Sequence, residues 1–135
     1  NGSKYASYDG DSNWDFYSDE RLKINIEKET NILDRIMKFD VVNFDFSDES
    51  NKTKQIGFLA QDVEPHFPEL VSETDDPKYD FNVKALGYTT FGVIAVGAVQ
   101  ELKQEKDNEI NELKKEISEL KELVNELKKQ GSYEN

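Results

Sequence analysis

The sequence predicts an α+β fold, in which a small globular domain of short strands and helices is followed by a long C-terminal helix. Residues 18–90 mix strand-like alternation with helix-like apolar spacing, whereas residues 91–130 keep a helical period. Hydrophobic residues make up 36% of the 135 positions and charged residues 34%, which is too few apolar side chains to fill a core along the whole chain. Part of the chain must therefore be elongated or bury its apolar face against another copy.

The first 17 residues are rich in Gly, Ser, Asn and Asp, interleaved with aromatic side chains. Turn formers that alternate with aromatics predict short strands and tight turns. The stretch is too short to be a domain, and it fits the end of a β-rich body that lies upstream. It has no signal-peptide pattern and reads as a segment cut from something longer.

The next part of the chain begins with a helical pattern and continues with a hairpin pattern. Helix-like apolar spacing is found at Ile26, Ile32, Leu33, Ile36 and Met37. Residues 39–46 then alternate as a strand does, at Val42, Phe44 and Phe46. Residues 55–60 read as a buried strand that pairs back with it, across a polar loop at 47–54. Beyond two prolines, Pro65 and Pro68, an exposed acidic loop is expected at 72–80.

The last part of the long helix carries three clear heptads. Their core positions are Ile110, Leu113, Ile117, Leu120, Val124 and Leu127. In a parallel arrangement, Glu109 and Glu116 of one chain reach Lys114 and Lys121 of a neighbour, and Lys128 repeats the same position. A helix with one narrow apolar seam needs a partner, so residues 110–127 predict a coiled coil rather than a lone helix held by internal Glu–Lys pairs.

The heptad pattern does not determine how many helices form this coil. β-branched residues at the first core position with leucine at the second favour two strands. Three heptads make a short coil, so the rest of the protein can dictate the number. Upstream, the core positions become Lys103 and Lys106, so we expect the register to break there. The apolar stretch 91–102 is expected to pack against the globular part.

Charge and composition exclude several classes of function. With 29 acidic and 17 basic side chains the net charge is −12, which nucleic-acid phosphates and anionic membranes repel, so neither is an expected partner. The absence of cysteine removes disulfides and thiolate chemistry, and His66, the single histidine, argues against a His-built metal site. No glycine loop for phosphate is present. We therefore expect no metal and no cofactor.

One short segment, Ser18-Asp-Glu-Arg-Leu-Lys23, could carry chemistry. By residue type alone, Ser18 followed by two acids is typical of a helix N-cap. The alternative is a serine nucleophile with Lys23 as its general base. That pair needs a bend between the two residues, and it needs a lysine that is neutral part of the time. A free lysine has a pKa of about 10.4, so burial or a nearby cation such as Arg21 has to favour the neutral form.

Three motifs in order resemble one family. They are SDERLK, then IGFLAQDVEPHFPELV at 56–71, then Tyr88 leading into the long helix. Together they are similar to the self-cleaving intramolecular chaperone domain at the C-terminus of phage tail spikes, tail fibres and neck appendages, of the endosialidase type. A related domain occurs in the membrane-bound myelin regulatory factors of animals. Asp62 stands where the family often has Glu.

The resemblance implies a homotrimer in which the domain holds three chains in register while an upstream passenger of the same polypeptide folds. It implies release by autoproteolysis between Tyr17 and Ser18, with Ser18 as nucleophile and Lys23 as base. Gln61 is a candidate for hydrogen bonding near the pair or, alternatively, a structural polar residue at a corner between strand and turn. Gly57 is expected at a close backbone approach. The implied setting is a phage virion precursor made in the host cytoplasm, with the chaperone part released after cleavage.

The predicted organisation has four parts. Residues 1–17 end the passenger, 18–90 form the chaperone domain, 91–130 form the long helix with the coiled coil at 110–127, and 131–135 are a tail. Two other functions remain open: a trimerisation module that does not cut, and a coiled-coil adaptor.

Overall fold

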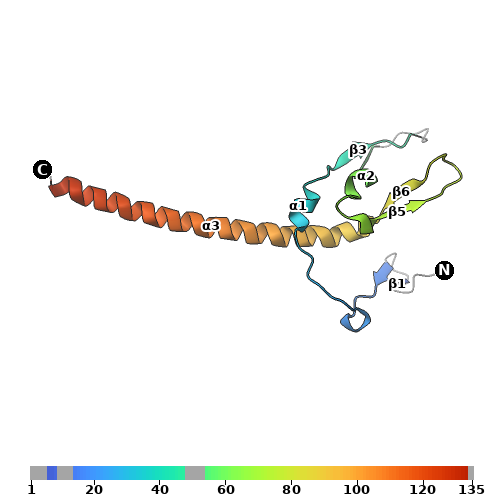
Figure 1. Cartoon of the computed structure of the whole chain (residues 1–135), viewed down its shortest axis with the longest axis horizontal. Helices are drawn as coiled ribbons and strands as arrows, with labels where there is room; N and C mark the ends of the chain where they lie inside the picture. The colour runs from blue at the N-terminus through green and yellow to red at the C-terminus, as the bar shows by residue number, and fades with distance from the viewer. Residues whose placement is uncertain (1–5, 9–13, 48–53, 134–135) are drawn as a thin grey trace.

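The computed structural model describes residues 6–8, 14–47 and 54–133, and it has the predicted α+β fold. A single helix, α3 (Tyr88–Tyr133), runs through the molecule, and a small globular unit packs on its first turns (Figure 1). Strands pair in three two-stranded antiparallel sheets. The short helices and strands, in chain order, are β1 (Ala6–Tyr8), β2 (Trp14–Phe16), η1 (Glu20–Leu22), α1 (Ile32–Ile36), β3 (Val42–Phe44), β4 (Gln55–Gly57), α2 (Ala60–Val63), η2 (Pro68–Leu70), β5 (Val71–Thr74) and β6 (Val83–Leu86).

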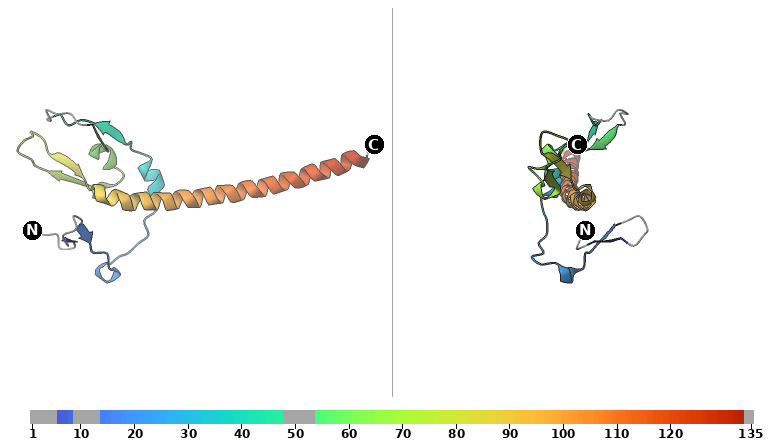
Figure 2. Two further views of the ribbon diagram at one scale, coloured as in Figure 1. Left: turned by 180° about the vertical axis from the view of Figure 1, so that it is seen from behind. Right: turned by 90° about the vertical axis from the view of Figure 1, so that its right-hand side faces the viewer.

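The N-terminal segment forms a hairpin, as its composition predicts. β1 and β2 are antiparallel, with Ala6 opposite Phe16 and Tyr8 opposite Trp14. Residues 1–5 and 9–13, on which part of the prediction falls, lie outside the described residues. The hairpin and η1 lie across α3 from the other two sheets in both orientations (Figure 2).

The middle of the chain confirms one predicted hairpin and corrects three other predictions. β3 pairs with β4 as expected, with Val42 opposite Gly57. The buried strand predicted at 55–60 is shorter and less buried than expected, because β4 ends at Gly57, Ile56 is 72% exposed and α2 begins at Ala60. The predicted helical spacing extends too far, because α1 begins only at Ile32, and Ile26 is 63% exposed in an irregular segment. The predicted loop at 72–80 is also wrong at its start, because residues 72–74 belong to β5.

The sequence did not predict β5, because neither face of this strand is apolar. Beyond Val71 its residues are exposed, so no alternation of burial marks it as a strand. It is held by pairing with β6, where Glu73 lies opposite Lys84. The Lys84 Nζ lies 3.7 Å from Glu73 and 2.5 Å from Glu64 of the segment after α2. These ion pairs, the Glu64 hydrogen bond first, raise the pKa of Lys84 and fasten the hairpin to α2.

The core lies where α1, α2 and η2 pack on the first turns of α3. Its buried cluster consists of Ile32, Val63, Phe67, Leu70 and Ala98. Phe39, Phe58 and Phe91 surround this cluster, with the rings of Phe58 and Phe91 4.7 Å apart. Ala60, Val63, Phe67 and Leu70 all come from the motif at 56–71, so that motif is mainly the internal face of the globular unit.

Gly57 lies at a close approach, as expected. A Cβ built on Gly57 would lie 2.3 Å from the hydroxyl of Tyr88. That hydroxyl accepts a hydrogen bond from the backbone N–H of Phe58 at 3.0 Å. The second and third motifs of the sequence therefore meet at one contact, which joins β4 to the first residue of α3.

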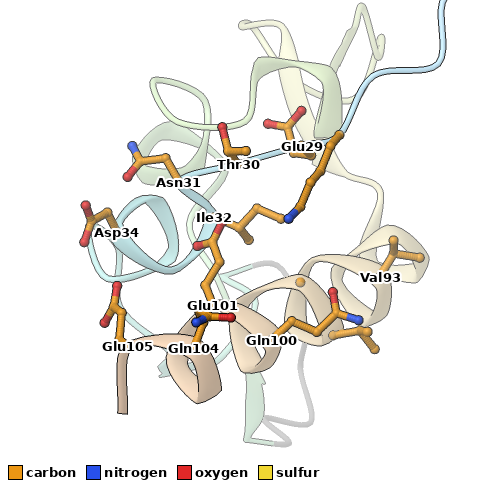
Figure 3. A pocket seen from close by; sticks show the side chains of 13 residues that line it. Glu29, Thr30, Asn31, Ile32, Asp34, Val93, Gln100, Glu101, Gln104 and Glu105 are labelled. Atoms are coloured by element: carbon orange, nitrogen blue, oxygen red, sulfur yellow. The ribbon is translucent and has the colours of Figure 1, made fainter. Parts of the chain in front are cut away.

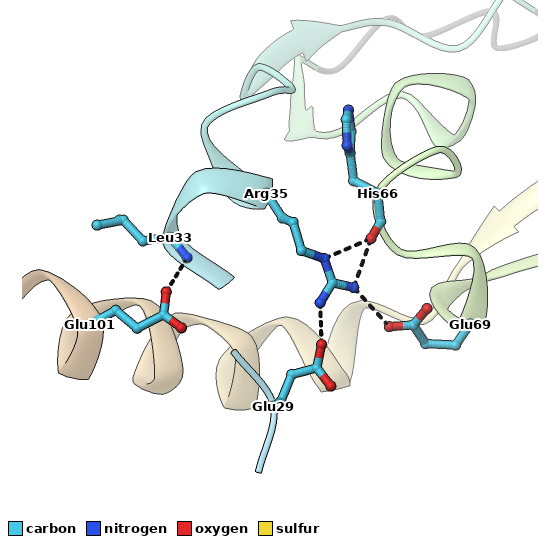
Figure 4. Close-up of polar contacts among 6 residues, drawn as sticks. All are labelled: Glu29, Leu33, Arg35, His66, Glu69 and Glu101. Carbon is cyan, nitrogen blue, oxygen red and sulfur yellow. Dashed lines mark hydrogen bonds and ion pairs between the residues drawn. The ribbon is translucent and has the colours of Figure 1, made fainter. Parts of the chain in front are cut away.

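Arg35 ties α1 to the corner between α2 and η2 (Figure 4). Its guanidinium donates two hydrogen bonds to the carbonyl of His66, at 3.0 and 2.7 Å, and lies 3.9 Å above the ring of Phe67. It also pairs with Glu29 and lies 3.6 Å from Glu69. His66 itself stacks on an aromatic ring and acts as a packing residue.

Beyond the globular unit α3 continues alone (Figure 1). All six predicted core positions of the heptads are exposed in the single chain, from 47% at Ile110 to 65% at Leu127. Such an apolar seam is stable in water only against a partner. Within the described residues, no helix is both long enough and apolar enough to cross a membrane.

Candidate functional site

The structure brings Ser18 and Lys23 together. The Nζ of Lys23 donates a hydrogen bond to the Oγ of Ser18 at 2.8 Å. This distance is within the range for direct proton transfer between a nucleophile and its base. The pair follows the N-terminal hairpin directly, with only Tyr17 between β2 and Ser18.

The bend that the pair requires is made by η1. Asp19 has extended backbone (φ −64°, ψ 131°), and the chain then makes one 3₁₀ turn before returning to extended conformation at Lys23 (φ −113°, ψ 145°). Two backbone hydrogen bonds close the turn, from Leu22 to Asp19 at 3.1 Å and from Lys23 to Glu20 at 3.0 Å. The turn therefore places the side chains at 18 and 23 on the same side.

Asp19, and not Ser18, caps this turn. The Oδ1 of Asp19 accepts a hydrogen bond from the backbone N–H of Arg21 at 2.9 Å. The interpretation of Ser18 as an N-cap is therefore wrong for η1, because the neighbouring aspartate fills that role. As a result the Ser18 hydroxyl is available to Lys23.

Arg21 is bound to Asp19 rather than directed at the lysine. Its Nε and Nη2 donate to the carboxylate at 3.0 and 2.7 Å. The side-chain hydrogen bond with Arg21, followed by the backbone one, lowers the pKa of Asp19, and the same contact raises the pKa of Arg21. Each charge in this pair largely offsets the other beside Lys23.

The site is open to solvent in a single chain. Ser18 and Lys23 are exposed, and so are the apolar side chains on either side of the lysine. Leu22 is 61% exposed, Ile24 is 86% exposed and Ile26 is 63% exposed. These three exposed apolar side chains, called the apolar edge below, have no cover in the single chain.

Gln61 lies in α2, on the other side of α3 from the serine–lysine pair (Figure 1). Its side chain is exposed. One chain therefore does not bring Gln61 to Ser18, and its support of the pair stays a prediction.

A groove of about 810 Å³ lies between residues 28–34 and α3, away from the pair (Figure 3). Glu101 projects from α3 toward α1 in this groove, and its carboxylate accepts the backbone N–H of Leu33 at 2.7 Å. Hydrogen bonds from the backbone of Leu33 and then Ile32 lower the pKa of Glu101. The polar wall of the groove therefore stabilises α1.

Nothing in the described part of the chain resembles a metal centre. No three His, Asp or Glu side chains among the described residues are grouped so that they could hold an ion.

Sequence analysis found the serine and the lysine but missed the residues that position them. Asp19 was interpreted as a first-turn acid. Asp is itself a common N-cap residue, whose carboxylate accepts the backbone N–H of the residue two positions later. The exposed apolar edge at Leu22, Ile24 and Ile26 was interpreted in part as helix, because a single isoleucine at a helical spacing resembles helix periodicity.

The sequence is similar to one family of known proteins and to two phage fibre proteins. Residues 18–72 match the model of a peptidase family described as the chaperone of endosialidase. Over 120 residues, which is 84% of this chain and 45% of the relative, the sequence is 32% identical to the long tail fibre protein Gp37 of Enterobacteria phage M1. Over 102 residues, 72% of this chain and 38% of the relative, it is 32% identical to Gp37 of Enterobacteria phage Ox2.

The match over residues 18–72 and the two fibre relatives agree with the resemblance to the C-terminal chaperone domains of phage fibres. The family that this part of the chain resembles is the one described as the chaperone of endosialidase. The chain spans less than half the length of the two fibre proteins that it matches.

Proposed function

We propose that this chain is an intramolecular chaperone that trimerises, guides the folding of an upstream fibre body, and releases itself by cleaving the bond between Tyr17 and Ser18. The observation that carries the proposal is the 2.8 Å contact between Lys23 Nζ and Ser18 Oγ, directly after a β-hairpin. The family match covers both residues, and the family is described as a peptidase and a chaperone.

The proposed cleavage starts with Ser18 attacking the carbonyl carbon of its own upstream neighbour. Neutral Lys23 accepts the hydroxyl proton as Oγ bonds to the carbonyl carbon of Tyr17. The ammonium then gives that proton to the nitrogen of Ser18, and the C–N bond breaks to leave an ester on Oγ. Water hydrolyses the ester, which gives a carboxylate on Tyr17 and restores the free hydroxyl of Ser18.

Assembly supplies what a single chain lacks. A lysine in water is protonated at neutral pH, and desolvation favours its neutral form. The uncovered apolar side chains of Leu22, Ile24 and Ile26 flank Lys23 on an exposed segment. A neighbouring chain packed over this edge would exclude water from the pair. Cleavage would then follow assembly and not precede it.

A trimer joined at one end is a physically reasonable device for folding a fibre. Interwoven β-structure depends on contacts between distant segments and separate chains, which form slowly and invite misassembly. Joining three chains at the C-terminal end makes their meeting effectively intramolecular. Once the chaperone has been removed, an unfolded fibre cannot refold by the pathway that formed it. The persistence of the fibre then depends on how slowly it unfolds, which is kinetic stability.

The full-length protein that carries this domain provides the test. On a denaturing gel the wild type should run as two fragments, and N-terminal sequencing of the smaller should begin at Ser18. Ser18→Ala should stay whole. Lys23→Arg should also stay whole, because a guanidinium keeps the charge but cannot act as a base. Sedimentation should give a trimer for all three proteins.

Matched controls distinguish the proposed catalytic roles of Ser18 and Lys23 from a general loss of folding. Ser72→Ala and Lys38→Ala change the same residue types at exposed positions away from the pair, and both should cleave as the wild type does. Cleavage that persists in Ser18→Ala would reject the mechanism. If the wild type forms trimers but never cleaves, the domain is a structural trimerisation module without peptidase activity. If the wild type is a monomer, the proposed chaperone function is rejected.

A further inference from the structure

We propose that Asn25 is a positioning residue for self-cleavage, through the left-handed conformation of its backbone and not through its side chain. That conformation turns the chain two residues after Lys23 and keeps the lysine Nζ within reach of the Oγ of Ser18. The inference rests on the proposed function and deepens it, because η1 fixes the chain only on the upstream side of the lysine.

Two asparagines of this chain have left-handed backbone. The φ angle is 53° at Asn25 and 59° at Asn31, and among the described residues no other non-glycine residue has a positive φ. In this region the Cβ of an L-residue crowds the backbone, and asparagine is one of the few residues with a side chain that tolerate it. Such a conformation persists only where the surrounding structure requires it. Each of the two asparagines therefore needs a physical reason.

The reason for Asn31 lies inside the globular unit. Asn31 precedes α1, at the point where the carboxylate of Glu101 accepts the backbone N–H of Leu33 at 2.7 Å. Asn25 is different, because it is exposed in the irregular segment between η1 and α1, outside the buried core (Figure 1). Packing of the globular unit therefore does not account for the conformation of Asn25.

The bend at Asn25 limits where Lys23 can lie. The turn η1 ends at Leu22, Lys23 is extended (φ −113°, ψ 145°), and the chain bends again at Asn25. Only Lys23 and Ile24 therefore separate two turns of the backbone. A lysine side chain has many rotamers, so a lasting contact with Ser18 depends on a fixed position of the lysine Cα. A turn on each side of Lys23 fixes that position better than a turn on one side.

The same bend shapes the apolar edge beside the lysine. Asn25 lies between Ile24, which is 86% exposed, and Ile26, which is 63% exposed. In a straight strand the two isoleucines would share one face, but a left-handed residue between them redirects the chain. The conformation at position 25 therefore also decides how this edge meets the neighbouring chain that is proposed to exclude water from the pair.

Substitutions at position 25 separate the backbone from the side chain. Glycine has no Cβ, so Asn25→Gly removes the amide and keeps the left-handed conformation accessible. Asn25→Val removes the same amide, but its β-branched side chain strongly disfavours that conformation. An amide that contacted the reacting groups would be lost in both variants, whereas the bend is lost only in Asn25→Val. The matched control is Glu27→Val, which places the same side chain in the same exposed segment at a residue without left-handed backbone.

The test measures the first-order rate of self-cleavage of the full-length protein on a denaturing gel. We expect Asn25→Val to cleave about tenfold more slowly than the wild type, which corresponds to about 1.4 kcal/mol in the barrier. Asn25→Gly should stay within about threefold of the wild type, because glycine loses only some backbone entropy. Glu27→Val should cleave at the wild-type rate. Each change is also made in Ser18→Ala, where sedimentation should give a trimer and the thermal midpoint should equal that of Ser18→Ala alone.

The outcomes distinguish this inference from the proposed function. A wild-type rate for Asn25→Val would overturn the inference and leave the proposed function intact. Asn25→Gly as slow as Asn25→Val would assign the effect to the amide, and equal slowing by Glu27→Val would assign it to any added valine, so either result would also overturn it. A lost trimer or a lower thermal midpoint for Asn25→Val would make the bend a requirement for folding and not for positioning. A wild type that stays uncut would reject the proposed cleavage, and this inference with it.

Discussion

Ser18 and Lys23 meet because one 3₁₀ turn lies between them, and that turn depends on Asp19. The carboxylate of Asp19 holds the backbone of Arg21 at 2.9 Å and the side chain of Arg21 at 2.7 Å. Both Ser18 and Lys23 could be predicted from a motif in the sequence. The cap could not be assigned with them, because Ser18 and Asp19 are equally good capping residues and only the backbone path decides between them.

Asp19→Ala should slow self-cleavage without preventing it. The turn loses its cap, so Ser18 and Lys23 spend less time in contact, and we expect a rate about fivefold lower, the size of an ordinary N-cap effect. The first-order rate at which the smaller fragment appears measures it. Asp19→Asn retains the capping oxygen and should lose less, while Glu20→Ala should cleave normally. A wild-type rate for Asp19→Ala would mean that the turn does not limit the reaction.

Gly57 and Tyr88 give a second residue-scale prediction, because the space for a Cβ at position 57 is taken by the Tyr88 hydroxyl. Gly57→Ala should destabilise the domain by about 1–3 kcal/mol through overpacking. Tyr88→Phe loses a hydrogen bond worth about 1 kcal/mol but vacates that space. The double variant should therefore be more stable than the sum of the two single changes implies, as measured by urea unfolding. Strict additivity would show that the clash is relieved in another way.

Among the elements, α1 shows what a local pattern can and cannot predict. Its apolar residues were visible in the sequence, but its start was not, because Asn31 makes no side-chain cap and has left-handed backbone (φ 59°). The capping group comes instead from Glu101, 68 positions along the chain. A cap supplied by a distant element leaves no local signal. The strand β5 was missed for a related reason, since pairing with β6 and not burial defines it.

The Glu101 cap predicts a pH-dependent contribution to stability. Its carboxyl has a folded pKa below the ordinary value of 4.5, so its contribution is complete above about pH 4.5 and is lost as the pH falls through the folded pKa. Glu101→Gln should therefore melt a few degrees below the wild type at pH 7. The difference should shrink toward zero below about pH 4, because protonated glutamate resembles glutamine.

Thermal melts of both proteins across this range, followed by circular dichroism, provide the measurement. Glu112→Gln, at an outer position of the predicted coil, should match the wild type at every pH. A gap between Glu101→Gln and the wild type that does not change with pH would indicate lost packing and not a lost charged cap.

In the whole molecule, a globular unit and a long helix were both predictable, because their patterns differ in period and in composition. The face of α3 used within residues 91–102 was not predictable. That stretch is apolar on two sides, so periodicity alone cannot tell which side packs on the unit and which is left uncovered. Exposure separates them, with Ala98 4% exposed and Val99 64% exposed. The turn η1, which joins Ser18 to Lys23, lies across α3 from the sheets β3–β4 and β5–β6, so the pair too lies outside the globular unit (Figure 2).

Lys103 and Lys106, which lie seven residues before Ile110 and Leu113, give the last prediction, at the scale of the assembly. If Lys103 and Lys106 lie at core positions, their joint replacement by leucine should strengthen association and raise the thermal midpoint by at least about 5 °C. The same change removes the residues that fix strand number, so a mixture of oligomers should appear in sedimentation velocity. The matched control replaces Lys115 and Lys129, which occupy outer positions, by leucine. It makes the same change in composition and should raise neither the midpoint nor the oligomer number. Equal effects from both pairs would mean that the added leucines cause non-specific hydrophobic association, and that Lys103 and Lys106 lie on an outer surface.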